Sequence, residues 1–96
     1  MFTWLNSQAV RSDLGFEVES MDRFTIDYRE GTKKVSVYVE NGLSDGKPCV
    51  IVMERNAFER WDDDTPDKIN PLEKQQEMLA NFISAMEFQG LAVILN

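Results

Sequence analysis

The alternation of apolar and polar residues in the first half of the chain restricts its fold more than any other feature. Between residues 16 and 39, three successive segments carry an apolar residue at about every second position, with charged or hydroxyl side chains between them. In the clearest segment, valine occupies every second position from Val35 to Val39. A period of two is typical of antiparallel strands with one buried face and one wet face. The chain is therefore expected to build its core on a sheet.

Turn residues separate the predicted strands from one another and from a further apolar run, residues 49–53. Residues 30–33 predict a short hairpin, because Gly31 can adopt a positive φ. Residues 41–48 are rich in Gly, Asn, Ser, Asp and Pro and predict a second turn region. The apolar run 49–53 that follows predicts a central strand, and the run 91–95 predicts a strand that closes the fold.

A helix is expected near each end of the chain. Phe2, Leu5 and Ala9 fall near one helical face, which predicts a less regular helix over residues 2–14 that Gly15 could end.

The second helix is predicted over about residues 71–88, with Asn70 as N-cap, Pro71 at the first helical position and Glu73 at the capping-box position. Gly90 supplies its stop. Its expected buried stripe consists of Leu72, Leu79, Phe82, Ile83 and Met86.

These elements predict an α+β fold. The expected architecture is an antiparallel or mixed sheet of about five strands, with the long C-terminal helix packed on one face and the weaker N-terminal helix beside it. With 96 residues, the chain suffices for one domain, residues 1–96, and not for two. Cys49 is the single cysteine and lies in an apolar run, so we expect a small buried hydrophobe and not a reactive thiol.

Charge and hydropathy narrow the range of partners. The chain has 17 acidic and 10 basic residues, a formal charge of −7, without a basic cluster that would bind nucleic acid phosphates or an anionic membrane. No run approaches the ~20 apolar residues that cross a bilayer, and no signal peptide is visible. We therefore expect a cytoplasmic protein with neither nucleic acid nor membrane as partner. A basic protein is the partner that suits this charge.

The chain lacks the residues on which most enzymatic chemistry depends. It contains no histidine, which removes the commonest general base and the usual zinc ligand, and its glycines form no phosphate-binding motif. Asp62, Asp63, Asp64 and Asp67 could in principle hold Ca²⁺, but they do not have the spacing of an EF-hand loop. We therefore predict no catalytic residues, no metal and no cofactor.

The acidic residues are densest between residues 54 and 67, where two aromatic residues accompany them. Aromatic side chains among carboxylates are typical of a hot spot for a basic partner. The alternative is that the aromatics, on one or two helical turns over residues 54–61, pack against the sheet while the acids are merely solvated; for Trp61 packing is preferred. The candidate partner-binding residues are Glu54, Phe58, Glu59, Trp61, Asp62, Asp63, Asp64 and Asp67.

Several segments between about residues 24 and 95 form a recognisable pattern: residues 28–31, 39–40, 50–53, 58–62, 69–74, 81–83 and 90–93. Together they resemble small bacterial immunity proteins of polymorphic or contact-dependent toxin systems. The resemblance implies a non-enzyme that neutralises a cognate toxin, often a nuclease, by tight direct binding. It gives no contact residues to carry over.

Two other hypotheses come from the residues. The first is a self-assembling or adaptor module, a small homodimer in which residues 91–95 pair across an edge. The second is an enzyme or small-ligand protein that uses carboxylates with Tyr28, Tyr38 or Arg29.

Overall fold

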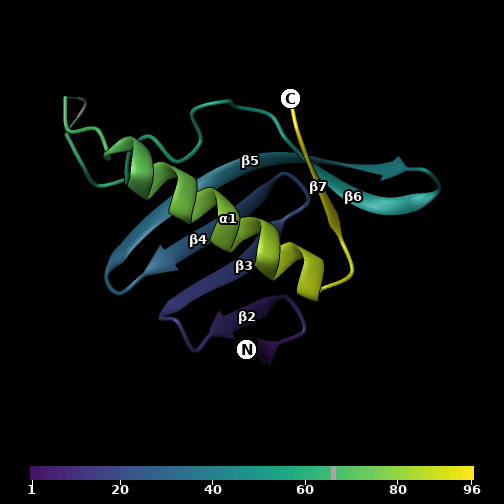
Figure 1. The fold of residues 1–96 in the computed structure, drawn as a ribbon. Coiled ribbons are helices and arrows are strands. Elements are labelled where there is room, and N and C mark those ends of the chain that lie inside the picture. The colour runs from purple at the N-terminus through teal and green to yellow at the C-terminus, as the bar shows by residue number, and fades with distance from the viewer. Residues whose placement is uncertain (66) are drawn as a thin grey trace.

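A computed structural model of the chain describes residues 1–65 and 67–96. These residues form a seven-stranded mixed sheet with a helix across one face (Figure 1). The α+β class is confirmed, but the sheet is larger than the predicted five strands. The elements are β1 (Phe2–Asn6), β2 (Ala9–Ser12), β3 (Phe16–Asp22), β4 (Thr25–Glu30), β5 (Lys33–Ser44), β6 (Lys47–Val52), α1 (Leu72–Phe88) and β7 (Ala92–Leu95).

The strands lie in the sheet in their sequence order, with β1 at one edge and β7 at the other. All neighbouring pairs from β1 to β6 are antiparallel, which short turns can join. Only β7 is parallel to its neighbour, β6, because α1 carries the chain back across the sheet between them (Figure 1). The predicted central strand is confirmed, since β6 has β5 on one side and β7 on the other.

The long strand β5 pairs with different neighbours along its two halves. Its first half pairs with β4, from Glu30↔Lys33 to Thr25↔Tyr38. Its second half pairs with β6, from Val39↔Val52 to Ser44↔Lys47. The first half of β5 therefore has an edge that β6 does not cover, and the segment between β6 and α1 lies along it.

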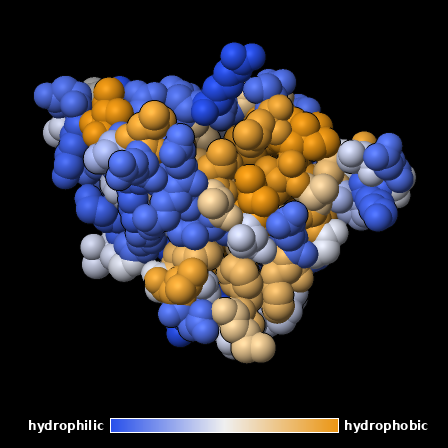
Figure 2. All heavy atoms as spheres, viewed as in Figure 1, coloured by the Kyte–Doolittle hydropathy of each residue, from blue (hydrophilic) through white to orange (hydrophobic). Residues whose placement is uncertain are grey.

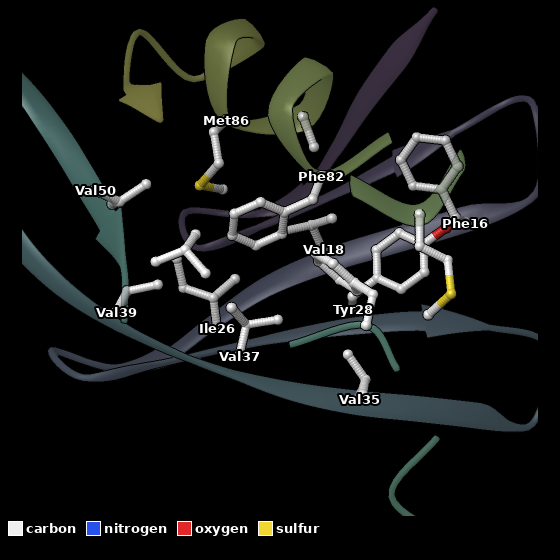
Figure 3. Close-up of a cluster of buried hydrophobic side chains, with 14 of the residues drawn as sticks. Phe16, Val18, Ile26, Tyr28, Val35, Val37, Val39, Val50, Phe82 and Met86 are labelled. Atoms are coloured by element: carbon white, nitrogen blue, oxygen red, sulfur yellow. The ribbon is translucent and has the colours of Figure 1, made fainter. Parts of the chain in front are cut away.

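The core lies between α1 and the sheet (Figure 3). The alternating valines of β5 face this core, as predicted, and Phe82 of α1 points down towards the sheet among them. Each fully buried side chain of this size contributes about 1.5–3 kcal/mol relative to exposure. Of the predicted helical stripe, Phe82 and Met86 are buried, Leu79 and Ile83 are partly buried, and Leu72 is exposed; Met78 and Ala85 complete the buried face.

The two ends of α1 differ in how well the sequence anticipates them. At the C-terminus, Gly90 has a φ of 82°, its N–H donates to the Glu87 carbonyl at 3.0 Å, and the Leu91 N–H donates to the Met86 carbonyl at 2.9 Å. This is a Schellman motif, so the predicted stop at Gly90 is correct.

At the N-terminus the predicted capping is wrong. Pro71 occupies the cap position, and no side chain among the described residues caps the helix. The Asn70 side chain instead turns inward and donates to the Phe58 carbonyl at 3.1 Å, because the buried carbonyl needs a donor that water cannot supply.

The N-terminal helix predicted over residues 2–14 is wrong. These residues form the hairpin of β1 and β2, in which Trp4 is paired with Val10. The second turn region is shorter than residues 41–48, because β5 extends to Ser44 and only Asp45 and Gly46 form the turn.

Within the described ranges, no helix combines the length and the apolar character that crossing a membrane requires.

Candidate functional site

The candidate residues lie in the segment between β6 and α1, residues 53–71, which we call the connecting segment. Its described residues, 53–65 and 67–71, form turns and bends in place of the helical turns expected over residues 54–61. Backbone hydrogen bonds fix its course: the Asp62 N–H donates to the Lys34 carbonyl, and the Asn70 N–H donates to the Glu59 carbonyl, both at 2.8 Å. The segment is therefore attached to the first half of β5 and to itself.

The two aromatic residues of the connecting segment belong to the core. Phe58 is 5% exposed and Trp61 is 6% exposed. Both pack on Tyr28 of β4, with ring centroids 5.7 Å and 6.2 Å away. This is the packing interpretation that was preferred for Trp61, and it leaves neither side chain exposed as an anchor for a partner.

Two of the aspartates hold the connecting segment in place. Asp62 accepts a hydrogen bond from the Ser36 backbone N–H at 3.2 Å, and it shares the Ser36 hydroxyl, 3.2 Å away, with Asp27, which lies closer at 2.9 Å. Asp64 has a largely buried side chain whose Oδ1 lies 3.4 Å from Lys33 Nζ and 3.7 Å from Lys68 Nζ. Its Oδ2 is buried and accepts no hydrogen bond from the described residues. These carboxylates are thus engaged within the protein.

The other two aspartates of the cluster are exposed. Asp63 makes no hydrogen bond or ion pair with the part of the chain that the structure describes. The pKa of Asp67 is lowered because the Thr65 side chain donates a hydrogen bond to its carboxylate. Asp67 therefore remains charged at neutral pH, and both side chains are exposed to a partner.

Five of the eight candidate residues meet around one open hollow of about 380 Å³, which we call the acidic hollow. They are Glu54, Glu59, Trp61, Asp62 and Asp64. Arg60 also lines this hollow and lies 3.3 Å from the Glu59 carboxylate, so the carboxylates outnumber the lining arginine. Phe58, Asp63 and Asp67 are not part of its lining.

A second open hollow of about 440 Å³ adjoins the first, because Glu54 lines both. Its other lining residues are Phe24, Tyr38, Val39, Glu40 and Met53, and we call it the aromatic hollow. Phe24 and Tyr38 are 54% and 58% exposed. Of these residues, Glu54 was predicted to bind a partner, and Tyr38 was considered only for an enzyme or small-ligand role; the others were not predicted as site residues.

Glu54 also borders a third hollow, an apolar cleft of about 360 Å³ between the start of α1 and the end of β7. Leu72, Leu79 and Leu95 contribute to its lining. Figure 2 shows hydrophobic side chains gathered beside the helix in the region of β7.

The residues proposed for an enzymatic role do not converge. Tyr28 and Arg29 are neighbours on β4 and point to opposite faces of the sheet. Tyr28 is buried, donates to Glu30 and accepts from Asn81 at 3.0 Å, while Arg29 pairs with Glu19 at 2.8 Å. Among the described residues, no group of three or more His, Cys, Asp or Glu side chains is arranged to hold a metal ion.

Comparison of the chain with protein-family models, with curated proteins and with solved structures gives no match.

Proposed function

We propose that this domain is a non-catalytic acidic binding protein whose partner is a basic protein, and that it acts as an immunity protein that neutralises a cognate bacterial toxin. The observation that carries the proposal is the position of Glu54. It is exposed where the acidic hollow and the aromatic hollow meet, so carboxylates and exposed aromatic rings adjoin on one surface.

The charge of the chain supports this partner class. A nuclease toxin must attract a polyanionic substrate and therefore presents a basic surface. A domain with a net charge of −7 is attracted to that surface and can cover it. Such attraction mainly accelerates association, while buried aromatic and arginine contacts mainly set how long the complex lasts.

The internal contacts of the acids divide them into two groups. Asp62 and Asp64 hold the connecting segment through Ser36, Lys33 and Lys68, so their replacement would disturb the fold as well as the charge. Glu54 and Asp63 are exposed and have no such contact among the described residues. Substitution of Glu54 and Asp63 is therefore the cleaner test of partner binding.

The test begins with the gene beside the one that encodes this chain. The proposal expects that gene to encode a large protein with a secretion-associated N-terminus and a small C-terminal toxin domain. When that domain is purified and titrated with the chain, we expect a nanomolar or tighter complex and loss of toxin activity at equal concentrations. A toxin domain that neither binds at micromolar concentrations nor loses activity overturns the proposal.

The edge strand β7 favours a second candidate, a self-assembling or adaptor module. β7 consists of Ala92, Val93, Ile94 and Leu95, so it lacks the charge or proline that usually protects an exposed edge. Pairing of β7 with β7 of a second copy would continue the sheet and cover part of the apolar cleft. Sedimentation at micromolar concentration tests this: a stable homodimer that Ile94→Lys dissociates supports it, and a monomer excludes it.

A further inference from the structure

We propose that the aromatic hollow receives an arginine side chain of the basic partner protein. This inference rests on the proposed function and adds to it the anchor that gives the complex specificity. The hollow has the three components that a guanidinium group needs: exposed aromatic rings, carboxylates beside them, and a fixed backbone beneath.

The aromatic component consists of Phe24 and Tyr38. Both rings are more than half exposed, and within the described chain no other ring stacks on either of them. An exposed aromatic ring presents a negative face that attracts a cation. A guanidinium group suits such a face better than an ammonium group, because it is planar and less strongly hydrated.

The same interaction already occurs at the rim of the hollow. The guanidinium carbon of Arg23 lies 5.8 Å from the centroid of the Phe24 ring, within the distance of a cation–π contact. Arg23 thus shows that the Phe24 ring is accessible to a guanidinium group. Tyr38 has no corresponding cation among the described residues, and its ring is available to a partner's arginine.

The carboxylate component consists of Glu40 and Glu54, which line the hollow together with the rings. Both side chains are exposed and make no ion pair with the described residues. Because a carboxylate can accept two parallel N–H bonds from a guanidinium group, either glutamate could orient the incoming side chain.

The backbone beneath the hollow is tied together by hydrogen bonds across the sheet. The Val39 N–H donates to the Phe24 carbonyl at 2.9 Å, and the Met53 N–H donates to the Tyr38 carbonyl at 3.1 Å. Asn41 Nδ2 also donates to the Arg23 carbonyl at 3.0 Å. The lining residues are therefore held in place before a partner arrives, which reduces the entropy that binding must remove.

The experiment titrates the full chain with hexa-arginine and with hexa-lysine at low salt, followed by NMR. We expect hexa-arginine to shift the Met53 methyl and Tyr38 ring signals. Replacement of the ring in Tyr38→Thr should weaken hexa-arginine binding about fivefold and hexa-lysine binding by less than twofold, while Tyr38→Phe should retain both affinities. Trp4→Thr is the matched control, because Trp4 is a half-exposed aromatic on β1 at an edge of the sheet, and it should change neither affinity.

The outcomes separate this inference from the proposed function. If Glu54→Gln and Asp63→Asn weaken hexa-arginine binding but Tyr38→Thr does not, the aromatic hollow is not the receptor, although the acidic surface still binds. The same conclusion follows if the Met53 and Tyr38 signals of the unmodified protein do not move, and this readout is independent of whether Tyr38→Thr folds. The proposed function fails separately, when the toxin domain does not bind the chain.

Discussion

Asp62 forms hydrogen bonds with the free edge of β5, one of them to Ser36, which lies 26 residues earlier in the chain. Its carboxylate accepts the Ser36 backbone N–H at 3.2 Å, and its own N–H donates to the Lys34 carbonyl at 2.8 Å. One residue of the connecting segment thus supplies two of the bonds that a neighbouring strand would make. It does so where β6 pairs only with the second half of β5.

Replacement of Asp62 should therefore lower stability although its side chain is partly exposed. We expect Asp62→Ala to lower the free energy of unfolding by about 1 kcal/mol, since the Ser36 N–H loses its acceptor while the Ser36 hydroxyl keeps its hydrogen bond to Asp27 at 2.9 Å. Asp62→Asn should cost less, because its amide oxygen can still accept the Ser36 N–H. Urea denaturation measures both, with Asp63→Ala as the control, which should change stability by less than about 0.5 kcal/mol. Equal effects of Asp62→Ala and Asp63→Ala on stability would show that the hydrogen bond from the Ser36 N–H to Asp62 does not hold the connecting segment in place.

Trp61 should behave as a core residue in solution. In the Trp4→Phe variant, Trp61 is the remaining tryptophan, so its emission should be blue-shifted and poorly quenched by acrylamide. Trp61→Phe should lower the free energy of unfolding by about 2 kcal/mol, because it leaves a cavity beside Tyr28. Emission that acrylamide quenches as readily as free tryptophan would contradict this placement.

Stability should fall in alkaline solution because of Tyr28 and Lys74. Burial raises the pKa of Tyr28 above its ordinary value of 10.0, and a 2.7 Å hydrogen bond to Glu30 raises the pKa of Lys74 above 10.5. Since both groups hold their protons more tightly in the folded state, their contribution is complete below these ordinary values. It is lost as the pH rises from there through the higher folded-state pKa values.

Urea denaturation between about pH 8 and pH 11.5 measures this loss. Tyr28→Phe should be less stable than the unmodified protein at pH 8, because Asn81 and Glu30 lose a hydrogen-bond partner. Its further loss of stability above pH 10 should be shallower, because the raised tyrosine pKa is gone. An equally steep loss in both proteins would exclude Tyr28 as a source of the pH dependence.

The sequence predicts hairpins where the turn is local, and fails where the chain is held by distant contacts. Gly31 has a φ of 59° and joins β4 to β5, as its turn chemistry indicates. Asp45 and Gly46 form an equally local turn, with φ values of 51° and 78°, typical of the Asp-Gly hairpin. The surrounding Gly, Ser and Pro residues nevertheless suggested a longer loop, and the end of β5 was missed.

The N-terminal segment shows how packing decides between two local patterns. The spacing of Phe2, Leu5 and Ala9 is compatible with a helix, but the chain turns where Asn6 accepts the Gln8 N–H at 2.8 Å. The Phe2 ring then packs 5.7 Å from Phe16 and 5.2 Å from Phe88, between centroids. Phe88 lies at the far end of the sequence, so this contact has no signature in the local pattern.

Only part of the candidate site could be predicted, because the rest of it depends on contacts between residues far apart in the sequence. The charge density of residues 54–67 is visible in the sequence, and five of the candidates do meet around the acidic hollow. Which aromatic residues are exposed depends on how the connecting segment folds back onto Tyr28, a tertiary contact. Phe58 and Trp61 are buried by it, whereas Phe24 and Tyr38 are left exposed.

The most direct test of an acidic binding surface compares two charge-matched variants. Glu54→Gln with Asp63→Asn removes one charge from the proposed surface and one exposed charge from the same connecting segment, and Asp45→Asn with Glu87→Gln makes the same charge change elsewhere. Asp45 lies at the tip of the β5–β6 hairpin, at the opposite end of the molecule from the connecting segment (Figure 1). Asparagine tolerates the positive φ of Asp45, so the control should keep its fold.

The measurement is the association rate constant of each variant with the neighbouring toxin domain at low and at high salt. We predict that the Glu54 and Asp63 variant associates roughly fivefold more slowly than the unmodified chain at low salt, that the control stays within about twofold, and that the difference shrinks at high salt. Equal rates for the two variants at low salt would contradict the claim that the partner docks at this surface.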